Sequence, residues 1–423
     1  MTLAEMTKEQ LVEYQNKLNQ EYADYKAKGL ALNMARGKPA VAQLDLSMDM
    51  LDIKPVKSAN GTDIRNYGVL DGIQEAKELL GAMMGMAPEN VIVFGNSSLN
   101  IMYDTVVRAL LFGVSEEATP WIQQGKLKFL CPSPGYDRHF GVTEQLGFEL
   151  ITVAMTDEGP DMDQVEKLVA DDASIKGIWC VPMYANPTGI TYSDEVVKRL
   201  ANMKTAAPDF RIFWDNAYCV HHLDFNNTDK LLNLYDECVK AGNEDRMYQF
   251  ASTSKITFPG AGIAGFSSSP ANIAYTKKLM GAQTIGHDKM NQLRHTTYFG
   301  GYEGLLNHMK KHAEIMKPKF DAVIATLTKE LGDLDICSWT NPKGGYFISF
   351  DTMPGCAKRV VALCKEAGVT LTGAGATFPY KKDPEDKNIR IAPSLPPVEE
   401  LQVAADLFCL AVKMASVEKL LAE

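Results

Sequence analysis

Three short apolar runs of the sequence are each followed by a polar side chain that could do chemistry. Lys255 comes shortly after one run, Asp215 ends another, and Asn186 follows a third. Runs of this length are typical of buried strands, and in open α/β sheets ligands bind beyond the carboxyl ends of the strands. A lysine, a carboxylate and an asparagine there predict a pyridoxal phosphate site, with Lys255 as the Schiff-base lysine and Asp215 as the partner of the ring nitrogen.

Each of these residues, taken alone, has a more common structural role. An aspartate at a strand end is usually a helix cap, Asn186-Pro187-Thr188-Gly189 is a turn sequence, and a lysine in a serine-rich turn is usually exposed. Their joint occurrence in this order favours the catalytic interpretation. Tyr218 lies three residues beyond Asp215, where it and Asn186 could both hydrogen-bond the 3′-oxygen of the ring. Lys255, once released from the cofactor, would carry the proton.

The phosphate of such a cofactor needs hydrogen-bond donors, and the turn at residues 95–98 could supply them. This turn joins an expected strand to an expected helix, and the backbone N–H groups of a helix N-terminus form an anion site. Serine hydroxyls add further donors, although each serine alone is more often a cap or a turn residue. We expect five residues to form the phosphate cup: Asn96, Ser97, Ser98, Ser252 and Ser254.

The complete set of motifs resembles the aminotransferases of pyridoxal-phosphate fold type I, over nearly the whole chain. The motifs are, in order, Asn186-Pro187-Thr188-Gly189, Asp215-x-x-Tyr218, Ser252-x-x-Lys255 and Ile389-Arg390-Ile391-Ala392. The resemblance implies that Arg390 grips the α-carboxylate of the substrate, for which a bidentate arginine is well suited.

The same resemblance assigns three further residues. Tyr136 matches the aromatic residue that stacks on the cofactor ring, and Gly37 matches a mobile glycine loop over the substrate. Tyr67 matches the tyrosine that reaches the phosphate of the neighbouring subunit, which implies a homodimer with shared active sites. One position departs from the wider family: the arginine that usually contacts the phosphate, eight residues after the lysine, is Ile263 here.

Residues 34–39 and 284–289 are similar to a subgroup of bacterial aspartate aminotransferases, which is related to MocR-type transcription regulators. The similarity implies transfer of the amino group from L-aspartate to 2-oxoglutarate, so the partners would be amino acids and 2-oxo acids. A side-chain carboxylate needs a second cation, and Arg36 and Lys289 are the leading candidates. For each of them a solvated surface charge is the more common role.

Two other functions stay open at this point. One is an aminotransferase for aromatic amino acids, kynurenine or 2-aminoadipate. The other is a non-catalytic ligand-sensing module with an aminotransferase fold. Against the sensing module, only about 35 residues precede the loop at Arg36, too few for a winged-helix DNA-binding domain.

The alternation of strands and helices positions these residues and predicts an α/β fold, with a mostly parallel central sheet flanked by helices. The pattern changes after about residue 310, which predicts a second, smaller α+β domain. We therefore expect an N-terminal segment (1–52) that packs with the small domain, a large cofactor-binding domain (53–310) and a small C-terminal domain (311–423).

Composition excludes several classes of function. The net charge of −10 gives no electrostatic support for nucleic-acid binding. The eight cysteines show no CxxC spacing, so neither a zinc site nor a disulfide framework is expected. The acidic start of the chain does not resemble a signal peptide, and no apolar stretch has the length of a membrane span. We expect a cytoplasmic enzyme without a metal.

Overall fold

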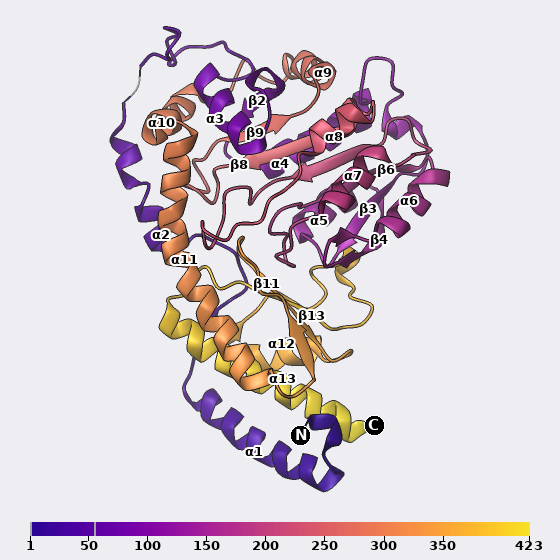
Figure 1. Cartoon of the computed structure of the whole chain (residues 1–423), viewed down its shortest axis with the longest axis vertical. Helices are drawn as coiled ribbons and strands as arrows, with labels where there is room; N and C mark the ends of the chain where they lie inside the picture. The colour runs from indigo at the N-terminus through magenta and orange to yellow at the C-terminus, as the bar shows by residue number, and fades with distance from the viewer. Residues whose placement is uncertain (1, 55) are drawn as a thin grey trace.

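The computed structural model describes residues 2–54 and 56–423. It contains a large sheet of eight strands, a small sheet of three strands and a further pair of two short strands, and one long helix connects the large and the small sheet (Figure 1). Met1 and Pro55 belong to the first two predicted parts of the chain and lie outside the described residues. The large sheet has the strand order β2-β9-β8-β7-β6-β3-β4-β5. Its strands are β2 (Val91–Phe94), β3 (Lys128–Ser133), β4 (Glu149–Thr156), β5 (Gly159–Pro160), β6 (Ile175–Cys180), β7 (Arg211–Asp215), β8 (Met247–Ser252) and β9 (Ala264–Ser267).

The centre of the large sheet is parallel, as predicted. Strands β8, β7, β6, β3 and β4 run in one direction, whereas β9 is antiparallel to both β8 and β2, and β5 is antiparallel to β4. The carboxyl ends of the parallel strands therefore share one edge of the sheet. Because β7 ends at Asp215 and β8 ends at Ser252, the sheet itself brings these two predicted site residues to that edge.

Helices cover both faces of the large sheet, which explains why its strands are apolar without alternation. On β7, Ile212 and Trp214 face one core and Phe213 faces the other. The helices around the two cores are α3 (Gln74–Met84), α4 (Ser98–Phe112), α5 (Asp137–Gln145), α6 (Met162–Asp171), α7 (Asp194–Asn202), α8 (Leu234–Lys240), α9 (Pro270–Met280) and α10 (Lys289–Phe299). This arrangement confirms the predicted α/β fold.

A third core surrounds the small antiparallel sheet β10-β11-β13. The first helix of the chain packs here, since Leu11, Leu18 and Tyr22 are buried against C-terminal residues, and Figure 1 shows α1 beside α13. The elements are α1 (Lys8–Ala27), β1 (Leu32–Asn33), β10 (Cys337–Trp339), β11 (Ile348–Thr352), α12 (Ala357–Glu366), β12 (Val369–Thr370), β13 (Asn388–Ile391) and α13 (Val398–Ala422).

One long helix, α11 (Tyr302–Leu331), belongs to both parts of the molecule. Its first half contributes Leu305 and Met309 to the core of the large sheet, and its second half contributes Phe320 and Leu327 to the core of the small sheet. The short α2 (Val41–Asp45) packs on α11, and the 3-10 helix η2 (Met48–Asp52) packs on α10. The domain boundaries at residues 52 and 310 stay a prediction.

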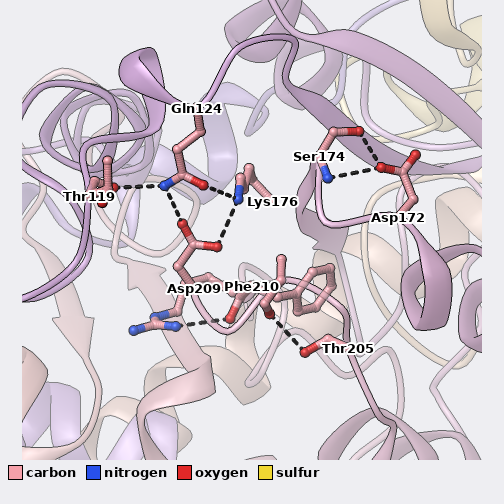
Figure 2. Close-up of polar contacts among 10 residues, drawn as sticks. Thr119, Gln124, Asp172, Ser174, Lys176, Thr205, Asp209 and Phe210 are labelled. Carbon is pink, nitrogen blue, oxygen red and sulfur yellow. Dashed lines mark hydrogen bonds and ion pairs between the residues drawn. The ribbon is translucent and has the colours of Figure 1, made fainter.

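The amino ends of the parallel strands are connected by a buried ion pair (Figure 2). Lys176 of β6 donates to Asp209 at 2.9 Å and to Gln124 at 2.6 Å, and Gln124 donates to the second carboxylate oxygen of Asp209 at 2.8 Å. Both carboxylate oxygens are thus satisfied, which a buried charge requires. Within the described part of the chain, no helix is both long and apolar enough to cross a membrane.

Candidate active site

A cavity of about 520 Å³ lies at the carboxyl edge of the large sheet, facing the small sheet. We call it the Lys255 pocket. Its walls come from the ends of β7 and β8, the starts of α4 and α5, residues 35–38, and Phe347, Thr372 and Arg390 from the smaller part. Most of the predicted site residues line it: Arg36, Gly37, Ser97, Ser98, Tyr136, Asn186, Asp215, Tyr218, Ser252, Ser254, Lys255 and Arg390.

Lys255 follows β8 and points its amine toward the ring of Tyr218, with Nζ 5.1 Å from the ring centroid. Burial lowers the pKa of the Lys255 ammonium, and the nearby Asp215 carboxylate partly opposes this effect. A lysine must be neutral to act as a nucleophile, and burial is a common way of raising the neutral fraction. Burial also raises the pKa of Tyr218 well above its usual value, so its hydroxyl stays protonated and can donate a hydrogen bond.

Asp215 is buried and has two different carboxylate oxygens. Oδ2 lies 2.8 Å from Nε2 of His139, a residue of α5 whose ring stacks on Trp179 with centroids 4.5 Å apart. Oδ1 is buried and has no hydrogen-bond partner within residues 2–54 and 56–423. A buried carboxylate oxygen without a donor is costly. It is therefore a natural acceptor for an N–H group of a ligand.

His139 was not among the predicted site residues. A signal was available, because His139 follows Tyr136 by three residues, which is close to one turn of a helix and puts both on one side of it. In the structure the rings of Tyr136 and His139 lie edge to face at 4.8 Å. Burial, and then the charge of Asp215, raise the pKa of Tyr136 to about 12. Its ring faces the pocket as a neutral phenol.

The expected phosphate cup is assembled from two turns. Ser254 donates to the backbone carbonyl of Asn96 at 2.8 Å and accepts from Ser252 at 3.1 Å, which joins the turn after β8 to the turn before α4. Ser97 is the N-cap of α4 and makes no capping bond with its side chain. Asn96 does not line the pocket, because its side-chain amide donates to the carbonyl of Pro259.

Ile263 is buried and its backbone N–H donates to Thr253, so this position is part of the core beneath the cup. The cations of this chain that line the Lys255 pocket are Arg36, Lys38, Arg138, Lys255 and Arg390. Arg36, Lys38 and Arg138 are exposed, and no carboxylate of the described residues lies within ion-pair distance of them. These three cations are therefore available to an anionic ligand.

Arg390 enters the pocket from β13. Its Nη1 donates to Asp137 at 3.1 Å and to Asn186 at 3.2 Å, its Nη2 donates to Thr372 at 3.3 Å, and the guanidinium lies over the ring of Phe347. The same ring lies against Gly37, where an added Cβ would overlap it. Gly37 thus allows the N-terminal segment to approach the pocket closely.

Besides Asn96, two further predicted residues, Lys289 and Tyr67, are not part of the pocket of a single chain. Nζ of Lys289 is buried and donates to the backbone carbonyl of Gly68 at 2.9 Å. Tyr67, the neighbour of Gly68, is 82% exposed. Lys289 therefore supports the loop that presents Tyr67 on the surface. Their predicted roles in binding stay predictions.

Known proteins are similar to this chain over nearly its whole length. Residues 6–423 match the family model described as aspartate amino-transferase. An aspartate aminotransferase from Corynebacterium glutamicum is 44% identical over 421 residues, which cover 99% of this chain and 97% of that protein. A protein of Mycolicibacterium smegmatis described as a putative aminotransferase is 48% identical over 418 residues, which cover 97% of each chain.

Solved structures show the same relationship. The crystal structure of an aspartate transaminase from Corynebacterium glutamicum matches with a TM-score of 0.96 at 44% identity and covers 99% of both chains. An α-aminoadipate aminotransferase from Thermus thermophilus, complexed with N-(5′-phosphopyridoxyl)-L-leucine, matches with a TM-score of 0.72 at 18% identity, over 93% of this chain and 95% of that one. The second match shows a shared fold.

Proposed function

Because this chain belongs to the aspartate aminotransferase family, we propose that it transfers the amino group of L-aspartate to 2-oxoglutarate, with pyridoxal phosphate as cofactor, giving oxaloacetate and L-glutamate. One observation carries the proposal: Lys255, the unpartnered oxygen of Asp215 and the guanidinium of Arg390 all meet in one cavity. A structural role alone does not call for a buried lysine, an unpaired carboxylate oxygen and an arginine in the same cavity.

The residues present fit pyridoxal phosphate. Oδ1 of Asp215 would accept a hydrogen bond from the ring nitrogen, and Asn186 and Tyr218 would donate to the ring oxygen. Tyr136 would stack on the ring. The start of α4 and the serines of the cup (Ser97, Ser98, Ser252 and Ser254) would hold the phosphate. When bound, the cofactor supplies an electron sink for the bond broken at the substrate Cα.

The chain's own residues would handle the proton and the charge. Lys255, whose pKa is lowered by burial, would take the proton from the substrate Cα at Nζ and return it to the carbon on the other side of the transferred amino group. Asp215 would keep the ring nitrogen of the bound cofactor protonated, and His139 holds the Asp215 carboxylate in place.

Two carboxylates of a dicarboxylic substrate need two cations. We propose that Arg390 binds the α-carboxylate and that Arg36 is this chain's leading candidate for the side-chain carboxylate, with Lys38 and Arg138 beside it. In this chain the amine of Lys289 donates to the Gly68 carbonyl and does not line the Lys255 pocket. Lys289 would therefore bind a substrate only at the site of a neighbouring subunit. Aspartate and 2-oxoglutarate would use one site in turn, so steady-state kinetics should be ping-pong.

We further propose that the working unit is a cytoplasmic homodimer. The dimer is supported by Tyr67, whose ring is exposed and whose counterpart in the resembling enzymes serves the neighbouring site. The cytoplasmic location is supported by the acidic net charge of −10 and by scattered cysteines that suit a reducing compartment.

A panel of single half-reactions tests the substrate. Purified enzyme with cofactor is mixed with L-aspartate, L-glutamate, L-alanine, L-phenylalanine, L-kynurenine or 2-aminoadipate, and the loss of the cofactor's visible absorbance is followed. Aspartate and glutamate should react with the highest kcat/KM. Much faster reaction with phenylalanine, kynurenine or 2-aminoadipate would replace the proposal with that substrate class.

Variants of the two cations sharpen this test. Losing a charge-assisted contact costs roughly 2–4 kcal/mol, or about a 30- to 1000-fold loss of kcat/KM. Arg390→Gln should show this loss with every amino acid. Arg36→Gln should show it with aspartate and glutamate but not with alanine, which has no side-chain carboxylate.

A further inference from the structure

Arg390, the proposed ligand of the substrate α-carboxylate, is already paired with a carboxylate of its own chain. Asp137, the first residue of α5, accepts a hydrogen bond from Nη1 of Arg390 at 3.1 Å. The Asp137 side chain is 33% exposed and lines the Lys255 pocket, whereas the Arg390 side chain is only 8% exposed. A carboxylate therefore sits where an anionic substrate is to be gripped.

We propose that Asp137 is a competing ligand of Arg390, which the α-carboxylate of the substrate must displace, and that it thereby determines how tightly the enzyme holds its substrates and products. The inference rests on the proposed function, because it takes Arg390 as the α-carboxylate ligand.

The hydrogen bonds of Arg390 show what a carboxylate bound to its two terminal nitrogens would have to displace. Nη1 uses its two protons on Asp137 and Asn186, and Nη2 uses one proton on Thr372. Nε is buried and has no partner among the described residues. A carboxylate that pairs with both terminal nitrogens needs a proton of Nη1. Asn186 is buried, so Asp137, which is partly exposed, is the ligand able to release one.

Displacement of Asp137 is inexpensive for the protein. Asp137 begins α5, where backbone N–H groups and the helix dipole stabilise a negative charge even without Arg390. Arg138, which has no carboxylate partner among the described residues, lies next to it in the sequence. Asp137 can therefore leave Arg390 and keep a favourable electrostatic environment, which makes it an exchangeable ligand and not a permanent block.

The exchange has a consequence for the reaction. Every substrate and product of the proposed cycle brings an α-carboxylate to the same arginine, so the competition weakens all of them alike. In a ping-pong cycle the first product must leave before the second substrate enters. A competing carboxylate that returns to Arg390 would therefore assist product release as much as it opposes binding.

The test is the affinity of the holoenzyme for maleate, a dicarboxylate with no amino or oxo group, measured by calorimetry. Asp137→Asn removes the charge while keeping the size of the side chain, and Asp137→Ala removes the hydrogen bond as well. Both should bind maleate about 3- to 30-fold more tightly than wild type, the range for removing one partly screened like charge a few ångströms away. KM for alanine and for aspartate should fall by the same factor.

A matched control exists on the surface. Asp163 lies in the first turn of α6 and pairs with Arg199 at 2.6 Å, with its side chain 87% exposed. Asp163→Asn changes the net charge by the same amount at a helix start and should leave maleate binding unchanged. Thermal melting of all variants checks that the fold is retained.

The sign of the effect decides the outcome. Weaker binding in both Asp137 variants would make Asp137 a residue that positions Arg390, and would overturn the inference. A change with aspartate but not with alanine would place Asp137 at the side-chain end of the site, and would overturn it too. Failure of the proposed function looks different: wild type would then not bind maleate, and Arg390→Gln would change nothing.

Discussion

At the scale of single residues, the pocket contains buried polar groups that the described residues satisfy only in part. Asp215 is bound by His139 on one oxygen only, and the other oxygen is buried without a donor among the described residues. Such an atom is tolerated where a ligand completes the bonding. The lowered pKa of Lys255 has the same origin, since a buried ammonium loses its hydration.

Replacing Lys255 with alanine should remove both the amine that binds the cofactor and the group that moves the proton. We expect Lys255→Ala to retain cofactor, held by the cup and Asp215, and to lose turnover by several orders of magnitude. Absorbance spectra and the aspartate half-reaction measure the two properties separately. Transamination at a near-normal rate would contradict the assignment of Lys255.

Replacing Asp215 with alanine tests the electron sink. Because no carboxylate would then keep the ring nitrogen protonated, kcat should fall by at least about 100-fold, the usual contribution of a positioned proton-transfer partner. Circular dichroism should stay close to wild type, whereas the melting temperature should fall slightly, because the buried His139 loses its bond to Oδ2 of Asp215. An unchanged kcat would leave Asp215 with only the structural bond to His139.

At the scale of elements, the two ends of the parallel strands have opposite tasks. The carboxyl ends present Asp215 and Ser252 to the pocket, and the amino ends are connected by the buried pair of Lys176 and Asp209 (Figure 2). Removing one partner of a buried pair leaves an uncompensated charge, whereas removing both does not. A variant that lacks one partner and a variant that lacks both should therefore differ in their free energy of unfolding.

Asp209→Ala should lower the free energy of unfolding by about 3–5 kcal/mol, because Lys176 would be left buried and unpaired. The double variant Lys176→Met,Asp209→Leu should be less destabilised than Asp209→Ala, despite carrying more changes. Urea unfolding at neutral pH measures both. If the double variant were the less stable of the two, the pair itself would be the source of stability.

A second group of buried side chains connects α2 to the loop of Lys255. Gln43 donates to Nδ1 of His312 at 3.0 Å and to the hydroxyl of Tyr346 at 3.0 Å, and Tyr346 donates to the carbonyl of Lys255 at 3.3 Å. His312 in turn lies 3.1 Å from His308. These contacts hold α2, which follows the Arg36 loop, in a fixed position relative to the loop of the proposed catalytic lysine.

The buried histidines predict acid lability. Burial, and then the proximity of His308, lower the pKa of His312 from 6.5 to about 3, so the folded protein holds it neutral. The stability from this neutral form is complete above pH 6.5 and is lost as the pH falls from 6.5 toward 3. Wild type should lose up to about 1.4 kcal/mol per pH unit from this residue alone.

In His312→Gln the slope of unfolding free energy against pH, between pH 6 and pH 4, should be smaller by about that amount. Urea unfolding at several pH values measures the slope, which does not depend on any constant destabilisation caused by the substitution. An unchanged slope would mean that His312 titrates at its ordinary pKa in the folded protein.

At the scale of the whole molecule, the pocket depends on two cores that one helix connects. Since α11 is buried in the core of the large sheet at Met309 and in the core of the small sheet at Phe320, it sets the position of Arg390 relative to Lys255 (Figure 1). Several apolar side chains of α2, η2 and residues 285–290 are exposed: Val41, Met48, Leu51, Ile285 and Met290. These exposed apolar side chains are a candidate surface for the proposed dimer.

Mixed dimers test the shared site. If Tyr67 serves the neighbouring subunit, a dimer of one Tyr67→Ala chain and one Arg390→Ala chain has one intact site and one with both defects. Refolding the two inactive variants together in equal amounts should restore about a quarter of wild-type activity, since half of the dimers are mixed. No recovery would mean that each site uses its own Tyr67, and a fully active monomer in sedimentation would exclude the dimer.

The sequence by itself placed two of the proposed catalytic residues at one edge of the large sheet. Asp215 ends one buried parallel strand and Lys255 follows another, and the carboxyl ends of such strands must meet at one edge whatever the rest of the chain does. The order of the motifs then carried the resemblance to the family, and with it Arg390.

Only the tertiary structure decided which polar groups pair with the residues of the site. The pairing of Asp137 with Arg390, of His139 with Asp215 and of Lys289 with the Gly68 carbonyl joins residues 253, 76 and 221 positions apart. Such pairs depend on how helices and loops pack on the sheet, and no local spacing encodes them. The physical reason is that hydrogen bonds act over about 3 Å, so the partner of a polar group is settled only when distant segments have been packed into place.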